Sequence, residues 1–144
     1  MSNKLLTSET TGTQLLEIAN KLNLYIDYLL PINKIKDVIL EKPFNIVNII
    51  LNVKGHWVGL FIQKNHAYYF NSFSDRYHDL PKEIIEFMKK NKIGYLTDNI
   101  KSIQDPNRGY CGEYVMDFLY YMNKKSSSNI DDYNEFLDNY EWTI

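Results

Sequence analysis

The chain contains a single cysteine, Cys111, which limits the chemistry that this residue can do. It has no second cysteine for a disulfide within the chain, and one thiol does not make a zinc site, so it is a nucleophile or a buried apolar residue. Apolar residues recur at helical spacing after it, at positions 115, 118, 119 and 122. Cys111 is therefore predicted at a helix N-terminus, where unpaired N–H groups and the helix dipole favour the thiolate.

A cysteine nucleophile needs a base, a group that orients the base, and donors for the oxyanion on the attacked carbonyl. His56 begins a strand-like run that turns and returns toward Asn71, so a hairpin would bring the two side chains together. The Asn71 amide oxygen can then accept the imidazole N–H and fix the tautomer. Gln104 and the backbone N–H of Cys111 can serve the oxyanion. The sequence therefore offers His56, Asn71 and Cys111 as candidate catalytic residues, and Gln104 and Cys111 as candidates for an oxyanion hole.

Each of these residues also fits a structural role, and other residues compete for the same functions. Asp75 is a second candidate to orient His56, although it lies beyond the end of the expected strand. His66 in the turn and His78 in a polar stretch are weaker candidates, because surface histidines are common. Trp57 follows His56 on a strand and so faces the opposite side, as a core residue would. The twelve tyrosines are interpreted mainly as half-buried residues of strands and helices.

The order and spacing of these residues resemble the signature blocks of the adenain family of viral maturation proteases. The blocks are Gly55-His56-Trp57, Phe70-Asn71-Ser72-Phe73 with Ser74-Asp75, and Gln104-x-Pro106-Asn107-x-x-x-Cys111-Gly112. The similarity extends from about residue 44 to residue 122, and the third block is the most specific. Asn71 is a departure, because adenain has a glutamate there and the SUMO-deconjugating proteases have an aspartate. A neutral amide orients the imidazole but stabilises an imidazolium less than a carboxylate does.

The resemblance implies an adenain-like fold, that is, a circularly permuted papain-like cysteine protease, and the activity that goes with it. We expect a Cys-His-Asn endopeptidase that needs no cofactor or metal and cleaves viral capsid or core precursors at small-residue, glycine-containing sites. The alternatives are a ubiquitin- or SUMO-like deconjugating isopeptidase and, as a non-enzyme, a pseudoprotease that only binds peptides. Adenain is stimulated by a disulfide-linked peptide and by DNA. Having no second cysteine and no marked basic excess, this chain is expected to be active without that peptide and to respond weakly to DNA.

Length and charge agree with one small enzyme domain. The chain has 144 residues and a net charge of −2, and we expect a single protease domain over residues 1–144, acting as a monomer. No Lys or Arg cluster marks a predicted helix, so weak or no nucleic-acid binding is expected. No apolar run is long enough to span a membrane, and the start of the chain lacks the apolar core of a signal peptide. We therefore expect no membrane partner and a location in the virion and the host cell interior, where a thiol stays reduced.

Hydrophobic periodicity predicts an α+β fold, a small mixed sheet flanked by helices. Thr13 is the expected N-cap of the first helix, and Pro31 is expected in the first turn of the second. The apolar, β-branched run 45–52 predicts an interior strand buried on both faces. The expected helices are 13–24, 31–40, 82–90, 111–122 and 131–140, and the expected strands are 45–52, 55–62, 67–73, 93–97 and 100–103.

Overall fold

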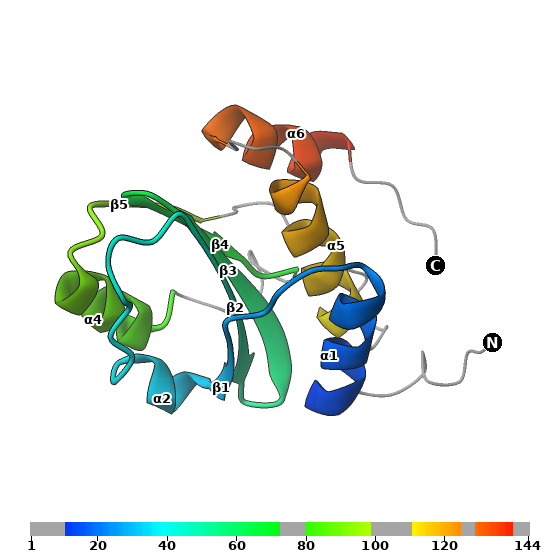
Figure 1. Cartoon of the computed structure of the whole chain (residues 1–144), viewed down its shortest axis with the longest axis horizontal. Helices are drawn as coiled ribbons and strands as arrows, with labels where there is room; N and C mark the ends of the chain where they lie inside the picture. Colours follow the sequence, from blue (N-terminus) through cyan, green and yellow to red (C-terminus); the bar gives the residue numbers. More distant parts are fainter. Residues whose placement is uncertain (1–10, 73–79, 99–110, 125–128, 140–144) are drawn as a thin grey trace.

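The fold is a mixed β-sheet covered by helices on both faces. The computed structural model describes residues 11–72, 80–98, 111–124 and 129–139. The described strands form one five-stranded sheet in the order β1-β2-β3-β4-β5 (Figure 1). One face carries α2 (Ile32–Ile35) and α4 (Lys82–Asn91), and the other carries α1 (Gly12–Lys21), α5 (Cys111–Asn123) and α6 (Ile130–Asn139). The predicted α+β class is confirmed, as is the mixed sheet flanked by helices.

Two consecutive antiparallel hairpins form the middle of the sheet, from β2 (Ile46–Val53), β3 (His56–Gln63) and β4 (His66–Phe70). Lys54 and Gly55 turn the chain between β2 and β3 with φ of 54° and 85°. Positive φ at both central residues is typical of the type I′ turn, whose twist matches that of the strands. Asn52 Oδ1 also accepts a hydrogen bond from Gly55 N at 2.8 Å. This turn makes His56 the first residue of β3. The predicted hairpin is the next one along the chain, from β3 to β4, and it is confirmed by the antiparallel pairing that starts at Gln63 and His66.

The edge strands are parallel to their neighbours: β1 (Tyr28–Pro31) pairs with β2, and β5 (Tyr95–Asp98) pairs with β4. The sequence pattern does not predict β1, because its residues fall between the first two expected helices. β5 lies close to the expected strand 93–97. The expected strand 100–103 lies outside the described residues.

The helix expected over residues 31–40 is wrong beyond Ile35, where α2 ends. Asn91, at the end of α4, explains why the chain leaves the helix. Its side-chain amide donates to Val38 O at 2.9 Å and accepts from Leu40 N at 2.8 Å. These bonds satisfy backbone groups that a longer helix would have paired internally.

The other helices lie where the periodicity predicts them, with small shifts at their ends. The N-cap of α1 is Thr11 and not Thr13, because Thr11 and Gln14 form a reciprocal capping box. Helix α6 begins at Ile130, preceded by a similar arrangement in which Asn129 Oδ1 accepts from Asp131 N at 2.9 Å. α5 begins at Cys111, as predicted.

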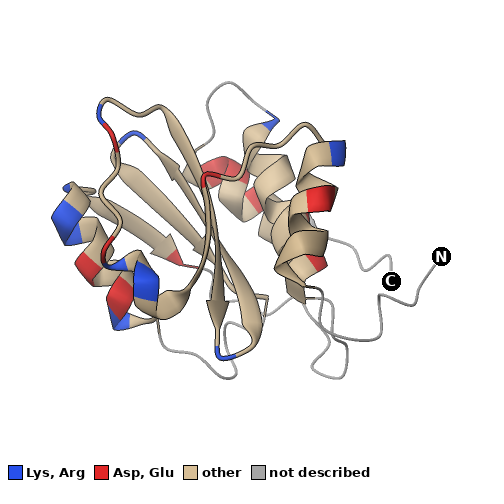
Figure 2. Ribbon diagram, turned by 60° about the horizontal axis from the view of Figure 1, so that its bottom comes forward, with Lys and Arg blue, Asp and Glu red and all other residues tan. Residues whose placement is uncertain are grey.

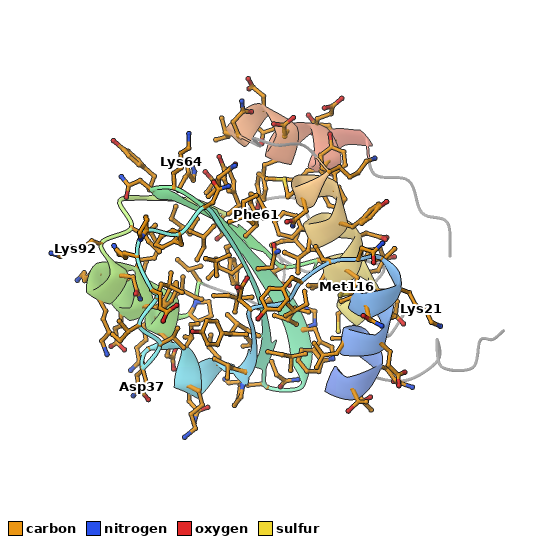
Figure 3. The ribbon with its side chains drawn as sticks, viewed as in Figure 1. Lys21, Asp37, Phe61, Lys64, Lys92 and Met116 are labelled. Carbon is orange, nitrogen blue, oxygen red and sulfur yellow. The ribbon has the colours of Figure 1, made fainter. Side chains whose placement is uncertain are left out.

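The strands are buried on both faces, so the core has two halves that share the sheet. Along β3, Val58, Leu60 and Ile62 pack toward α4, while Trp57 and Phe61 pack toward α5. Figure 3 shows Phe61 of β3 and Met116 of α5 directed into the interior, with Lys21, Lys64 and Lys92 at the periphery. This double burial accounts for the almost uninterrupted apolar sequence of β2 and β3.

Charged residues of both signs lie on α1 and α4, whereas α5 and α6 carry only acidic ones. In Figure 2, Lys or Arg and Asp or Glu positions lie side by side on α4, and the interior strands carry almost no charge. Among the described helices, none has the length and apolar character needed to cross a membrane.

Candidate active site

The first residues of β3 extend past the end of β4 and leave room for side chains from other elements. β4 ends at Phe70, which pairs with Gly59, so His56 lies beyond the last described pair. Asn71 follows Phe70 directly and is a diagonal neighbour of His56 on the same face of the sheet. The His56 Nε2 and Asn71 Oδ1 atoms are 2.8 Å apart. The expected pairing of these two residues by the hairpin is therefore present.

This hydrogen bond determines which imidazole nitrogen carries the proton. An amide oxygen can only accept, so Nε2 must be the donor. In the neutral ring the lone pair is then on Nδ1, which is the nitrogen that can take up a proton. Asn71 is 1% exposed, so water does not compete effectively for its oxygen. The pair can thus hold His56 in a single tautomer and orientation.

Cys111 is brought to the same end of the sheet by helix α5. Its sulfur accepts a hydrogen bond from Trp57 N, with 3.4 Å between N and Sγ. Trp57 directly follows His56 on β3. One residue therefore supplies the imidazole, and the backbone N–H of the next contacts the sulfur. The thiol is largely buried, with 6% of the residue exposed. The sulfur of Cys111 therefore contacts the backbone of the residue that follows His56, although the two segments are far apart in sequence.

The environment of the thiol differs in one respect from the sequence-based expectation. Burial raises the pKa of Cys111, and the nearby Glu113 carboxylate raises it further. Hydrogen bonds from the N–H groups of Trp57, Gly112 and Cys111 itself lower that pKa, as expected at a helix N-terminus, but burial outweighs them. The N–H groups at the helix start lower the pKa of the thiol as expected, and burial has the larger, opposite effect. The sulfur accepts from backbone N–H donors at a position where burial favours the neutral thiol.

Several other candidates have clear positions. His66 lies at the opposite end of β4, stacked on Tyr68 with ring centroids 4.1 Å apart, and its Nε2 is 2.7 Å from Thr97 Oγ1. Trp57 is 7% exposed in the core beneath α5, which confirms its predicted structural role. Gln104, Asp75 and His78 lie outside the described residues.

Sequence reasoning missed two contributions of β3, because both come from its backbone. The Trp57 N–H is a donor to sulfur, and no residue type signals such a donor. Gly59 lies under α5 without a side chain, and an interior glycine in an apolar strand is the signal that could have pointed to a close helix contact. Within the described part of the chain, no three His, Cys, Asp or Glu side chains are grouped as metal ligands would be.

Comparisons with known proteins show the family and the fold of the chain. Residues 25–142 match the model of the Ulp1 protease family, C-terminal catalytic domain. The fold is similar to the crystal structure of the ASFV pS273R protease, with a TM-score of 0.61 and 15% identity over 90% of this chain. The match covers 66% of that protein, so this chain spans slightly less than two thirds of its length. No curated protein sequence matches the chain. The family match covers most of the chain, including His56, Asn71 and Cys111, and the chain belongs to the Ulp1 protease family, a family of cysteine proteases.

Proposed function

We propose that this chain is a cysteine endopeptidase in which Cys111 is the nucleophile, His56 the general base and Asn71 the residue that orients His56. One arrangement carries the proposal. The 2.8 Å bond between His56 and Asn71 supports a base with a fixed tautomer, and the 3.4 Å bond from Trp57 N to the Cys111 sulfur supports a nucleophile next to the strand that carries this base. A pseudoprotease would not need both contacts.

The reaction begins from the neutral pair, because burial favours the thiol. As Sγ attacks the substrate carbonyl carbon, His56 Nδ1 takes the thiol proton, and the carbonyl electrons move onto oxygen. We assign the oxyanion to the Cys111 N–H and, from the family resemblance, to Gln104. The imidazolium then gives its proton to the leaving amine, the C–N bond breaks, and an acyl-enzyme remains. His56 next deprotonates a water, which attacks the thioester and releases the acid and the thiol.

For the substrate, we propose viral capsid or core precursors cut at small-residue sites, in the virion and the host cell interior. The support is the sequence resemblance to maturation proteases together with the similarity of fold to a protease of a virus. The matching family model favours a second candidate, deconjugation of a ubiquitin- or SUMO-like protein. Both activities would use the same thiol chemistry, so they differ only in the protein that is recognised.

Cleavage assays on purified full chain test both the chemistry and the substrate. Candidate precursors and SUMO- or ubiquitin-like precursors are incubated in reducing buffer with the wild type, Cys111→Ala and His66→Ala. His66→Ala is the matched control, since His66 lies at the far end of β4. We expect cleavage by the wild type and the control, and none by Cys111→Ala. Cleavage by Cys111→Ala at the wild-type rate would refute the proposal, and the substrate that is cut decides between the two candidates.

A further inference from the structure

Gly59 lies where helix α5 comes closest to the sheet. A Cβ built on Gly59 would be 3.0 Å from Val115 Cγ1 and 3.3 Å from Phe118 Cδ2. Its backbone is not in the left-handed region, in contrast to Gly55 with φ of 85°. Glycine therefore fits this position because it has no side chain, which lets α5 approach the strand closely. No unusual backbone conformation requires it.

The contact at Gly59 and the contact at the sulfur lie side by side along the same two elements. Cys111, Val115 and Phe118 share one stripe of α5, and Val115 is about 6 Å along the helix from Cys111. Trp57 and Gly59 are two residues apart on β3, roughly 6.6 Å. The two spacings match, so α5 contacts β3 at Gly59 and, one turn earlier, its first residue Cys111 accepts the hydrogen bond from Trp57 N.

We propose that Gly59 is a positioning residue, which sets the distance of α5 from β3 and so holds the Cys111 sulfur on the Trp57 N–H, beside His56. This inference rests on the proposed role of Cys111. A Cβ contact of 3.0 Å is tighter than ordinary van der Waals contact, so a methyl group at Gly59 would have to displace Val115 by a few tenths of an ångström. A comparable movement of the sulfur would stretch a bond that is 3.4 Å long.

The neighbours of Gly59 have little freedom to absorb the added methyl group. Val115 is 0% exposed, and a β-branched residue in a helix has one strongly preferred rotamer. Phe118 is also 0% exposed, and its ring stacks on Phe70 with centroids 4.8 Å apart. The helix as a whole is therefore expected to move, and Cys111 with it.

The test uses Gly59→Ala, Val115→Ala and the double variant Gly59→Ala/Val115→Ala. The double variant removes the atom that the new methyl group would meet. Gly94→Ala is the matched control, because its Cβ would be 2.8 Å from Asn65 Nδ2, a tight contact at the other end of β3. For each full-length variant, kcat, KM, the thermal midpoint and the pH midpoint of Cys111 alkylation are measured.

We expect Gly59→Ala to lower kcat about 10- to 100-fold with KM within about threefold, as for a small misplacement of a reacting group. Its alkylation midpoint should rise, because the Trp57 N–H no longer favours the thiolate. Glu113 lies on α5 and moves with Cys111, and a greater distance from the His56 imidazole would move the midpoint in the same direction. The double variant should return to within about threefold of Val115→Ala. Gly94→Ala should lose thermal stability but keep its kcat.

Two results would overturn the inference: a folded Gly59→Ala with wild-type kcat and alkylation midpoint, or a folded double variant as slow as Gly59→Ala. If Gly59→Ala does not fold, the double variant decides, since it should fold and retain the kcat of Val115→Ala. Failure of the proposed function is recognised separately, by full cleavage in Cys111→Ala. The alkylation midpoint does not depend on proteolysis, so it tests the position of the sulfur even in that case.

Discussion

Replacing Asn71 by aspartate places a carboxylate in the position that bonds His56, and its effect on the pH profile can be worked out from the geometry. The amide oxygen of Asn71 is 2.8 Å from His56 Nε2, and the residue is 1% exposed. Asn71→Asp keeps the size and the acceptor but adds a negative charge. A charge there stabilises the imidazolium more than the neutral imidazole, so protonated His56 persists to higher pH.

The size of the shift follows from the two kinds of hydrogen bond. A neutral hydrogen bond contributes about 0.5 to 1.5 kcal/mol, and one to a charged group about 1.5 to 3 kcal/mol. The difference of about 1 to 1.5 kcal/mol corresponds to roughly 0.7 to 1.1 pH units, at about 1.36 kcal/mol per unit. Burial of the new carboxylate at this nearly inaccessible position opposes its ionisation, so we expect the lower end, about 0.7 unit.

The assay is kcat/KM against pH, which reports the ionisations of the free enzyme. Because the neutral imidazole is the active base, the acid limb of Asn71→Asp should lie at higher pH than that of the wild type. Asn65→Asp is the matched control: Asn65 Oδ1 accepts from Gly94 N at the other end of the hairpin, and its acid limb should not move. An unchanged or lowered acid limb in Asn71→Asp, combined with a large loss of activity in Asp75→Ala, would show that Asp75 orients His56.

Four further outcomes are expected. Asn71→Ala should lower kcat less than His56→Ala does, because an orienting amide transfers no proton; equal losses in the two variants would contradict this role. The pH midpoint for alkylation of Cys111 by iodoacetamide should be higher in the folded protein than in urea, since burial raises the pKa of this thiol; a reaction rate already at its plateau in mild acid would instead indicate a thiolate–imidazolium pair. Tyr133→Phe should lower the free energy of unfolding by about 1 kcal/mol in urea titrations, because the Tyr133 hydroxyl donates to a buried carbonyl of β4 at 2.6 Å; no change would mean that this bond contributes nothing net. Purified enzyme in reducing buffer should be active without a linked peptide and nearly insensitive to DNA; basal inactivity rescued by either addition would refute this.

The parts of the fold that the sequence predicts are those held by local interactions. The positive φ of Lys64 fits the short turn between β3 and β4, and this hairpin sets the register that places Asn71 near His56. The α5 stripe begins at Cys111 because its apolar residues repeat within one helix. Both features depend on residues close together in the chain, so composition and spacing contain the necessary information.

The parts that the sequence does not predict depend on long-range partners. The chain leaves its helix after Ile35 because Asn91, from a distant helix, bonds Val38 and Leu40. The raised pKa of Cys111 results from burial under elements that the local sequence does not identify. From the sequence, a helix N-terminus predicts only that the pKa of a thiol is lowered. Tertiary packing buries the thiol, and this burial raises its pKa by more.

The neutral amide of Asn71 and the buried thiol of Cys111 favour the same protonation state of the pair. An amide stabilises the imidazolium less than a carboxylate would, and burial destabilises the thiolate. We infer that the enzyme rests as thiol and imidazole, so negative charge forms on sulfur only as the attack begins. The N–H groups of Trp57 and Gly112 then act on that developing charge, where preorganised donors contribute most. Because Trp57 follows His56 directly, one short segment of β3 orients the base and stabilises the nucleophile, which makes the depth of α5 on β3 a determinant of the reaction rate.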